Sequence, residues 1–127
     1  MVCPLIKGMR ILIVDDNIGL AWILQVMLEE EGYEVKVAKD GGEGYLAFLL
    51  FEPDLILTDI QMPIENGIEL VRHIRLHNPD VRAVYMSSDL GYYGSVLQEE
   101  KEKHKACVLS KPFSKDELMR SLSACSL

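Results

Sequence analysis

The chain has 127 residues, of which 49% are hydrophobic and 26% are charged, and its formal net charge is −7. These values indicate one ordinary globular domain with a buried core, and they exclude a disordered or fibrous class. The negative charge argues against direct binding of nucleic acid, which relies on Lys and Arg at the phosphate backbone. The sequence has no signal-peptide pattern and no apolar run near the roughly 20 residues of a membrane span, so we expect a cytoplasmic protein without membrane contact.

The three cysteines, Cys3, Cys107 and Cys125, form no CxxC pair and have no metal-ligand spacing. An odd number of cysteines without such a pattern indicates reduced thiols in a reducing compartment. Cys107 lies in an apolar stretch, and we expect it in the core.

The first predicted strand is residues 10–14, an apolar run that ends on Asp15 and Asp16. Asn17 is placed to cap the helix that follows. The apolar residues of this helix recur at helical spacing and are Leu20, Ile23, Leu24, Met27 and Leu28. A second stripe consists of Ile18, Trp22 and Val26. It is either an extension of the core face, which we favour, or an exposed docking surface for a partner helix.

The next two segments are a strand and a short helix. Residues 33–38 alternate apolar and charged side chains, which is typical of a strand near the edge of a sheet. Residues 40–42 form a predicted turn, and residues 45–51 a helix that stops near Pro53. The glycines at 41–44 do not have the spacing of a phosphate-binding loop.

Residues 55–63 combine a short apolar run with an acidic residue at its end, and this pattern gives the strongest indication of a functional site. Four apolar or β-branched residues lead directly into Asp59, and prolines bound the run on both sides. Such a run predicts a strand buried on both faces, as in a parallel sheet. A carboxylate at its end lies where open α/β sheets bind ligands, although it could also merely cap the next element.

The second half of the chain repeats the alternation. Asn66 and Glu69 form a predicted capping box before a helix, and residues 83–86 form a strand that ends at Ser87. The helix over residues 90–105 is weakened by two glycines, and we expect its charged run, residues 99–105, to be a solvated face. Residues 106–109 form a strand that leads to Lys111, and a capping box at 114–117 opens the last helix.

Five strands alternating with five helical segments predict an α/β fold, a doubly wound five-stranded parallel sheet in a single domain. The strand ends then share one edge of the sheet, where they bring together Asp15, Asp16, Asp59, Ser87 and Lys111. Crowded carboxylates repel one another, and Mg²⁺ is the natural counterion for them. A magnesium ion, a lysine and a hydroxyl around one carboxylate suit phosphoryl transfer to an aspartate.

The motifs Val14-Asp15-Asp16, Thr58-Asp59 through Met62-Pro63 with Gly67, Ser87 and Lys111-Pro112-Phe113 resemble the response-regulator receiver domains of two-component signalling. The resemblance covers about residues 9–125 and implies a flavodoxin-like (βα)5 fold. It implies that Asp59 accepts a phosphoryl group from a histidine kinase or a histidine phosphotransfer protein. Mg²⁺ would be held by Asp15, Asp16, Asp59 and the main-chain carbonyl of Gln61, with Asp16 a more direct ligand than Asp15. Lys111 and Ser87 would contact the phosphoryl oxygens, and the Lys111–Pro112 bond would be cis.

The resemblance further implies a signalling domain rather than a conventional enzyme. Such a domain promotes its own phosphotransfer and dephosphorylation, and phosphorylation changes its binding to an output domain or effector. We expect residues 1–127 to form one receiver domain with no output domain in this chain. Whether it acts alone or within a longer regulator stays open.

Two positions depart from the family pattern. Val108 stands where the family often has Tyr or Phe, so the usual aromatic relay is not implied here. Trp22 stands where a basic or polar residue is common, which favours a partner-binding strip on the first helix. Gln61 and Asp89 occupy positions that tune dephosphorylation in the family.

Two alternatives belong to other classes of protein. A phosphatase of the haloacid-dehalogenase type also uses an aspartate and Mg²⁺, but it needs a second acid two residues after the nucleophile, where this chain has Gln61. A pseudo-receiver would have the same fold and bind partners without being phosphorylated.

Overall fold

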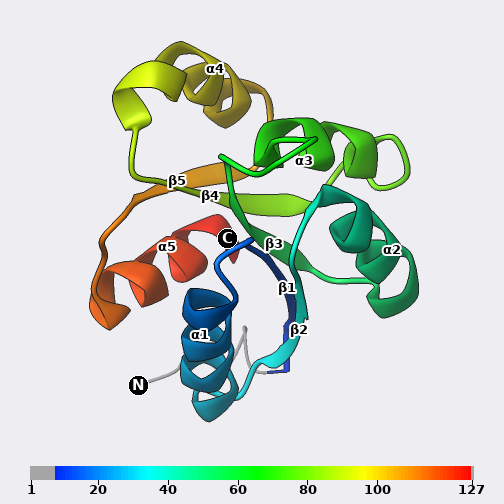
Figure 1. Ribbon diagram of the computed structural model, residues 1–127, viewed down its shortest axis with the longest axis vertical. Helices are drawn as coiled ribbons and strands as arrows, with labels where there is room; N and C mark the ends of the chain where they lie inside the picture. The colour runs from blue at the N-terminus through cyan, green and yellow to red at the C-terminus, as the bar shows by residue number, and fades with distance from the viewer. Residues whose placement is uncertain (1–7, 127) are drawn as a thin grey trace.

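The computed structural model describes residues 8–126, except for the side chain of residue 126. Strands and helices alternate over this range (Figure 1). They are β1 (Arg10–Val14), α1 (Ile18–Glu30), β2 (Glu34–Ala38), α2 (Gly41–Phe51), β3 (Leu55–Asp59), α3 (Gly67–Arg75), β4 (Arg82–Ser87), α4 (Leu90–Lys103), β5 (Ala106–Ser110) and α5 (Lys115–Ser126). Cys3 lies outside the described residues.

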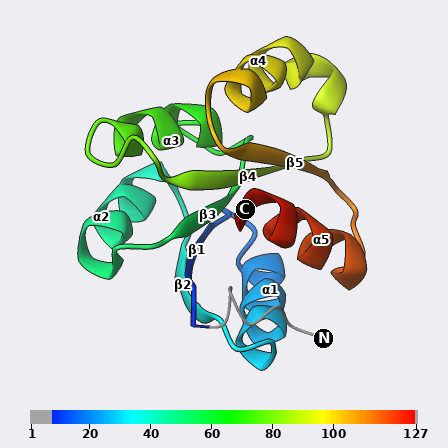
Figure 2. The ribbon, with the colours of Figure 1, turned by 180° about the vertical axis from the view of Figure 1, so that it is seen from behind.

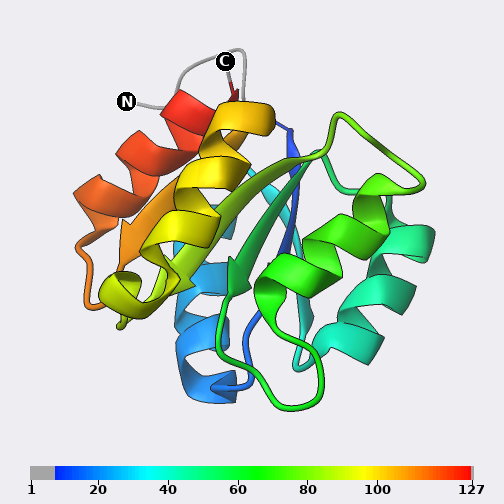
Figure 3. The ribbon, with the colours of Figure 1, turned by 90° about the horizontal axis from the view of Figure 1, so that it is seen from above.

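The five strands form one parallel sheet in the order β2-β1-β3-β4-β5. Helices α1 and α5 cover one face, and α2, α3 and α4 cover the other (Figures 1 and 2). Figure 3 shows the sheet between these two layers. The predicted doubly wound fold is confirmed, and the alternating strand β2 lies at an edge of the sheet as expected. None of the described helices has both the length and the apolar character to cross a membrane.

Strand β3 is buried along its whole length, because it lies in the middle of the sheet with helices on both sides. Its side chains alternate between two apolar clusters. Leu55 and Leu57 pack with α1 and α5, whereas Ile56 packs with α2, α3 and α4. This burial on both faces explains the continuous apolar run that precedes Asp59.

The beginning of α2 differs from the prediction. The expected turn and late helix start were wrong, because the helix begins at Gly41, and Asp40 caps it by accepting a hydrogen bond from Glu43 N at 2.8 Å. A Cβ atom on Gly44 would lie 3.1 Å from both Leu70 and Val14 side-chain atoms. Glycine therefore allows α2 to pack tightly against β1 and α3, although glycine weakens an isolated helix.

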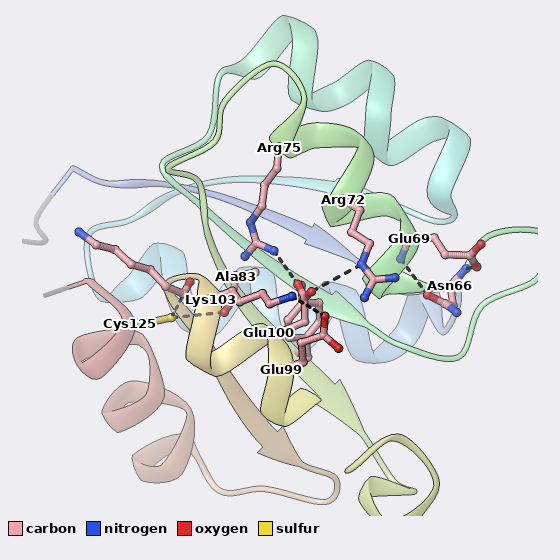
Figure 4. A network of polar contacts seen from close by, with 11 residues as sticks. Asn66, Glu69, Arg72, Arg75, Ala83, Glu99, Glu100, Lys103 and Cys125 are labelled. Carbon is pink, nitrogen blue, oxygen red and sulfur yellow. Dashed lines mark hydrogen bonds and ion pairs between the residues drawn. The ribbon is translucent and has the colours of Figure 1, made fainter. Parts of the chain in front are cut away.

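Two side-chain environments also differ from the prediction. On α1, the buried face consists of Ala21, Leu24 and Leu28, whereas Ile23 is 51% exposed rather than part of the core. On α4, Glu100 is buried, although the whole charged run was expected to be solvated. The Glu99–Lys103 pair expected in this run is present, with 2.8 Å between its charged atoms (Figure 4).

Candidate functional site

Three carboxylates converge at the carboxyl-terminal edge of the sheet. Asp15 and Asp16 follow β1, and Asp59 is the last residue of β3, the neighbouring strand. One oxygen from each carboxylate lies within 4.8 Å of the others. Asp15 is fully buried, Asp59 is 8% exposed and Asp16 is open to solvent. The strand order therefore brings Asp59 next to Asp15 and Asp16, although Asp15 and Asp59 are 44 positions apart in the sequence.

Lys111 reaches this cluster from the end of β5. Its Nζ lies 3.1 Å from Asp15 Oδ2 and 3.5 Å from Asp59 Oδ1. Its backbone N–H donates to the carbonyl of Ser87 at 2.8 Å, which fixes the loop against β4. The Lys111–Pro112 peptide bond is cis, as expected. One cation thus bridges the two buried acids.

The carboxyl group of Asp59 is held in an unfavourable environment for its charge. Burial raises its pKa to about 6 from the ordinary 3.8, and Asp15 and Asp16 act in the same direction, while Lys111 lowers it. Burial removes water from the anion, and the neighbouring acids repel it. A carboxyl group whose pKa is shifted by burial together with specific charged neighbours is a candidate functional residue.

Thr58 and Ser87 are two buried hydroxyl residues at the same edge of the sheet as Asp59. Ser87 ends β4 and is 1% exposed, and its Oγ accepts a hydrogen bond from the backbone of Asp89 at 2.9 Å. Thr58 is fully buried, and its Oγ1 donates to the carbonyl oxygen of Asp59 at 2.9 Å. Thr58 therefore holds the backbone of Asp59, while Ser87 lies on the adjacent strand at the same edge of the sheet.

Gly67 sets the approach of α3 to this site. Its N–H donates to the carbonyl of Ile60 at 2.9 Å, and a Cβ atom at this position would lie 2.2 Å from the backbone oxygen of Asp59. No side chain fits in that space. The glycine is required by close contact with the Asp59 backbone rather than by an unusual backbone angle.

Replacing Gly67 with Ala is expected to destabilise the fold by about 1–3 kcal/mol or more, because the methyl group forces Asp59 or α3 to move. Gly94 supplies the matched control. It lies in α4, where a Cβ would meet nothing within 4 Å. Gly94→Ala should stabilise the protein by about 1 kcal/mol through helix propensity. Urea unfolding of both variants measures the difference, and equal stabilities would contradict the predicted clash.

Three further residues named in the sequence analysis lie in the loops and strands around the acidic cluster. Gln61 is exposed in the loop after β3, and its carbonyl as a metal ligand stays a prediction. Val108 is half-buried in β5, in register with Tyr85 of β4, so β5 carries no aromatic residue at the expected relay position. Asp89 caps α4 by accepting a hydrogen bond from Tyr92 N at 3.1 Å.

An apolar surface adjoins the acidic cluster. Ile18 and Trp22 on α1 are each 64% exposed, so the favoured assignment of this stripe to the core was wrong for both, while Val26 is half-buried. A pocket of about 320 Å³ lies beside Lys111 and is lined by Leu20, Ser88, Pro112 and Phe113 as well. The sequence did not reveal this pocket, because it forms between the start of α1 and the loop after β5.

Comparison with known proteins agrees with this geometry. The family model described as response regulator receiver domain matches residues 11–123. The chain is 32% identical over 111 residues to sporulation initiation phosphotransferase F of Bacillus subtilis, and the match covers 86% of each protein. It is 29% identical over 112 residues to the DNA-binding transcriptional regulator NtrC of Rhizobium meliloti, but it spans only 23% of that longer protein.

A solved structure gives the same result. The response regulator TrrA of Thermotoga maritima, in complex with Mg²⁺-BeF, is 31% identical to this chain, and the two structures superpose with a TM-score of 0.79. The match covers 92% of this chain and 98% of TrrA. This chain therefore belongs to the response regulator receiver domain family, the phospho-acceptor domains of two-component signalling.

Proposed function

We propose that Asp59 is the residue that accepts the phosphoryl group, from a phospho-histidine on a histidine kinase or a phosphotransfer protein. The observation that carries the proposal is the contact of Lys111 Nζ with both Asp15 and Asp59, at 3.1 Å and 3.5 Å, inside a cluster of three acids. Asp59 is the acid of this cluster at the end of the central strand. It combines partial access, at 8% exposure, with a destabilised charge.

The transfer needs a nucleophile and groups that receive the phosphoryl oxygens. A carboxylate oxygen of Asp59 attacks phosphorus, the P–N bond of the donor breaks, and the departing imidazole keeps the electron pair and takes up a proton. Lys111 exchanges its carboxylate contacts for the arriving phosphoryl oxygens. Because the Ser87 oxygen already accepts from Asp89, its own hydroxyl proton can be donated to a phosphoryl oxygen.

The donor set fits Mg²⁺, which prefers carboxylate oxygens and keeps several waters. Asp15 uses one oxygen for Lys111 and the other for the backbone N–H of Asn17, at 2.9 Å. Asp16 and Asp59 therefore have more oxygen atoms to offer, and the main-chain carbonyl of Gln61 would complete the protein's share. When bound, the ion would offset the repulsion among the acids and withdraw charge from the phosphoryl group. The Mg²⁺-BeF complex of TrrA supports this assignment.

Acetyl phosphate with Mg²⁺ tests the proposal without a partner protein. Intact mass spectrometry should detect the addition of one phosphoryl group, and an excess of EDTA should abolish it, because Lys111 alone then faces the combined negative charge of the acids and the anionic donor. Calcium, which is larger and less strict in its geometry, serves as the control ion. A protein that gains no phosphoryl group with Mg²⁺ would instead be a pseudo-receiver.

The exposed apolar stripe of α1 is the proposed contact for the donor protein. Ile18 and Trp22 lie in the first turns of α1, which begins two residues after Asp16 of the acidic cluster. A large exposed aromatic near a reactive group is typical of a protein interface. Binding here would bring the donor histidine close to Asp59.

Trp22→Ala is expected to slow phosphotransfer from a phospho-histidine protein by about tenfold or more, because interface aromatics commonly contribute over 1 kcal/mol. Phosphorylation by acetyl phosphate should not change, since that small donor needs no protein contact. Leu50→Ala is the control, because Leu50 is 88% exposed on α2 and does not belong to the α1 stripe. Equal rates for the two variants with the protein donor would rule out the α1 contact.

A further inference from the structure

Cys107 and Cys125 meet at the edge of the sheet opposite to the Asp59 site. Cys107 is the second residue of β5, and Cys125 lies in the last turn of α5. Helix α5 runs back along the sheet after β5 and so returns to the start of that strand. Both side chains belong to the apolar cluster between the sheet and the layer of α1 and α5.

The Cys125 thiol is held in place by the starts of two strands. Its Sγ donates to the carbonyl of Ala83 at 3.3 Å and lies 3.7 Å from the carbonyl of Lys105 (Figure 4). Val84, the residue after Ala83, is in register with Cys107 on the neighbouring strand. Cys107 and Cys125 line the same small pocket at this end of the sheet.

The two thiols differ in access to solvent. Cys125 is 4% exposed, whereas Cys107 is half-buried. A surface pocket of about 150 Å³ is lined by both cysteines together with residues 104–106 and 124. Of the two thiols that line this pocket, Cys107 is the more accessible to a small oxidant.

The pKa values of the two thiols also differ, and the more exposed thiol has the lower pKa. The neighbouring Cys125 thiol lowers the pKa of Cys107 to about 7 against the opposing effect of burial, and the charge of Lys101 also lowers it. The neighbouring Cys107 thiol and burial raise the pKa of Cys125. The thiolate is the nucleophilic form of cysteine, so Cys107 is the better nucleophile of the two.

We propose that Cys107 and Cys125 are a redox-active dithiol that hydrogen peroxide converts into an intramolecular disulfide. The Cys107 thiolate attacks one peroxide oxygen, the O–O bond breaks, and Cys107 becomes a sulfenic acid while the other oxygen leaves as water after protonation. The Cys125 sulfur then attacks the sulfenic sulfur, an S–S bond forms, and a second water leaves. The two thiols lose two electrons in total, and the peroxide gains them.

The disulfide would fasten the last turn of α5 to the beginning of β5. Asp59, Lys111 and Ser87 lie at the other edge of the sheet, so phosphoryl acceptance should continue in the oxidised protein. The dithiol therefore does not depend on the function proposed for Asp59, and each can be tested separately.

The test uses the full chain with Cys3→Ser, so that the pair supplies the remaining thiols. After treatment with hydrogen peroxide, thiol titration in denaturant should fall from two groups to none. Intact mass should decrease by two hydrogen atoms in a monomer, and dithiothreitol should reverse the change. Phenylarsine oxide, which bridges two neighbouring thiols, should add once to the reduced protein and not to the oxidised one.

Single substitutions in this background assign the order of events. Cys125→Ser should accumulate a sulfenic acid on Cys107 that dimedone traps, and Cys107→Ser should leave the buried Cys125 reduced. Cys125→Ala provides a second variant if serine disturbs the packing. The proposal is overturned if the two-thiol protein keeps both thiols, forms disulfides only between molecules, or oxidises Cys107 without consuming Cys125.

Discussion

Asp59→Asn should abolish phosphoryl incorporation from both acetyl phosphate and a phospho-histidine donor. The amide has nearly the same size as the carboxyl group, but it cannot act as the anionic nucleophile that forms an acyl phosphate. Asp15 and Asp16 remain in the variant, so it tests whether one specific acid of the cluster is the acceptor. Intact mass after treatment with donor and Mg²⁺ measures the result.

Asp80→Asn is the matched control for this substitution. Asp80 lies in the exposed turn between α3 and β4 and is not part of the acidic cluster. It removes the same charge from the chain, and phosphoryl incorporation should be unchanged. If Asp59→Asn still gained a phosphoryl group, another residue would be the acceptor.

The same variant should be more stable than the wild-type protein in the presence of EDTA near neutral pH. The pKa of Asp59 is about 6 in the folded protein and has an ordinary value of 3.8. Because the folded-state pKa is raised, the stability associated with the protonated form is fully present below the unfolded value and is lost as pH rises through about 6. The total loss is about 3 kcal/mol, of which about 1–1.5 kcal/mol falls between pH 5 and pH 7.5.

Urea unfolding at these two pH values measures this effect. The difference in free energy of unfolding between Asp59→Asn and wild type should grow with pH, because only the wild-type protein loses stability as Asp59 ionises. A difference that is independent of pH would show that Asp59 ionises normally. That outcome would contradict the raised pKa of Asp59, whereas the phosphorylation experiment alone tests its role as acceptor.

Glu100→Gln should lower the free energy of unfolding by about 3–5 kcal/mol, because it removes the charge of a buried ion pair. The Glu100 side chain is 4% exposed and accepts hydrogen bonds from Arg75 Nη1 at 2.6 Å and from the Tyr85 hydroxyl at 2.9 Å (Figure 4). Arg72, from the exposed side, places its Nε 3.5 Å from the second carboxylate oxygen. Removing the negative charge would leave Arg75, itself only 6% exposed, without a counterion.

The pKa of Glu100 reports the balance of forces in this network. Burial acts to raise it, but the hydrogen bonds from Arg75 and Tyr85 and the positive charges outweigh burial, so the pKa is lowered. The carboxylate therefore stabilises the fold above its unfolded-state pKa, and this contribution is lost as pH falls through the folded-state value. The network ties α3, β4 and α4 together two residues before Ser87.

Glu99→Gln is the control for this prediction. Glu99 is the preceding residue of α4 and pairs with Lys103, but both side chains are more than half exposed, at 52% and 64%. An exposed pair of this kind contributes at most about 1 kcal/mol. Urea unfolding should therefore separate the two neighbouring substitutions by several kcal/mol, and similar values would contradict the buried network. Arg75→Met combined with Glu100→Leu should recover part of the lost stability, since no buried charge is then left unpaired, although the buried Tyr85 hydroxyl loses its acceptor.

Sequence patterns alone predicted the sheet and the acidic cluster. Each apolar run ends on a polar residue, as in Val14-Asp15 and Thr58-Asp59, and parallel strands must deliver such residues to one edge. The capping boxes at Asn66 and Ser114 were also predicted correctly, because they depend on residues three positions apart. These features follow from local periodicity and from the few ways in which alternating strands and helices can connect.

The tertiary structure decided which side chains became buried or came into contact across elements. Glu100 lies in a run of charges whose composition indicates a solvated face, yet Arg75 and Tyr85, from a different helix and a strand, provide a buried site for it. Trp22 and Ile23 follow a helical apolar pattern but face outward, because the sheet that α1 covers is filled by Ala21, Leu24 and Leu28. The contact between Cys107 and Cys125 likewise depends on where α5 ends against β5. Burial and contact between distant elements are set by how those elements pack, which no local window of sequence contains.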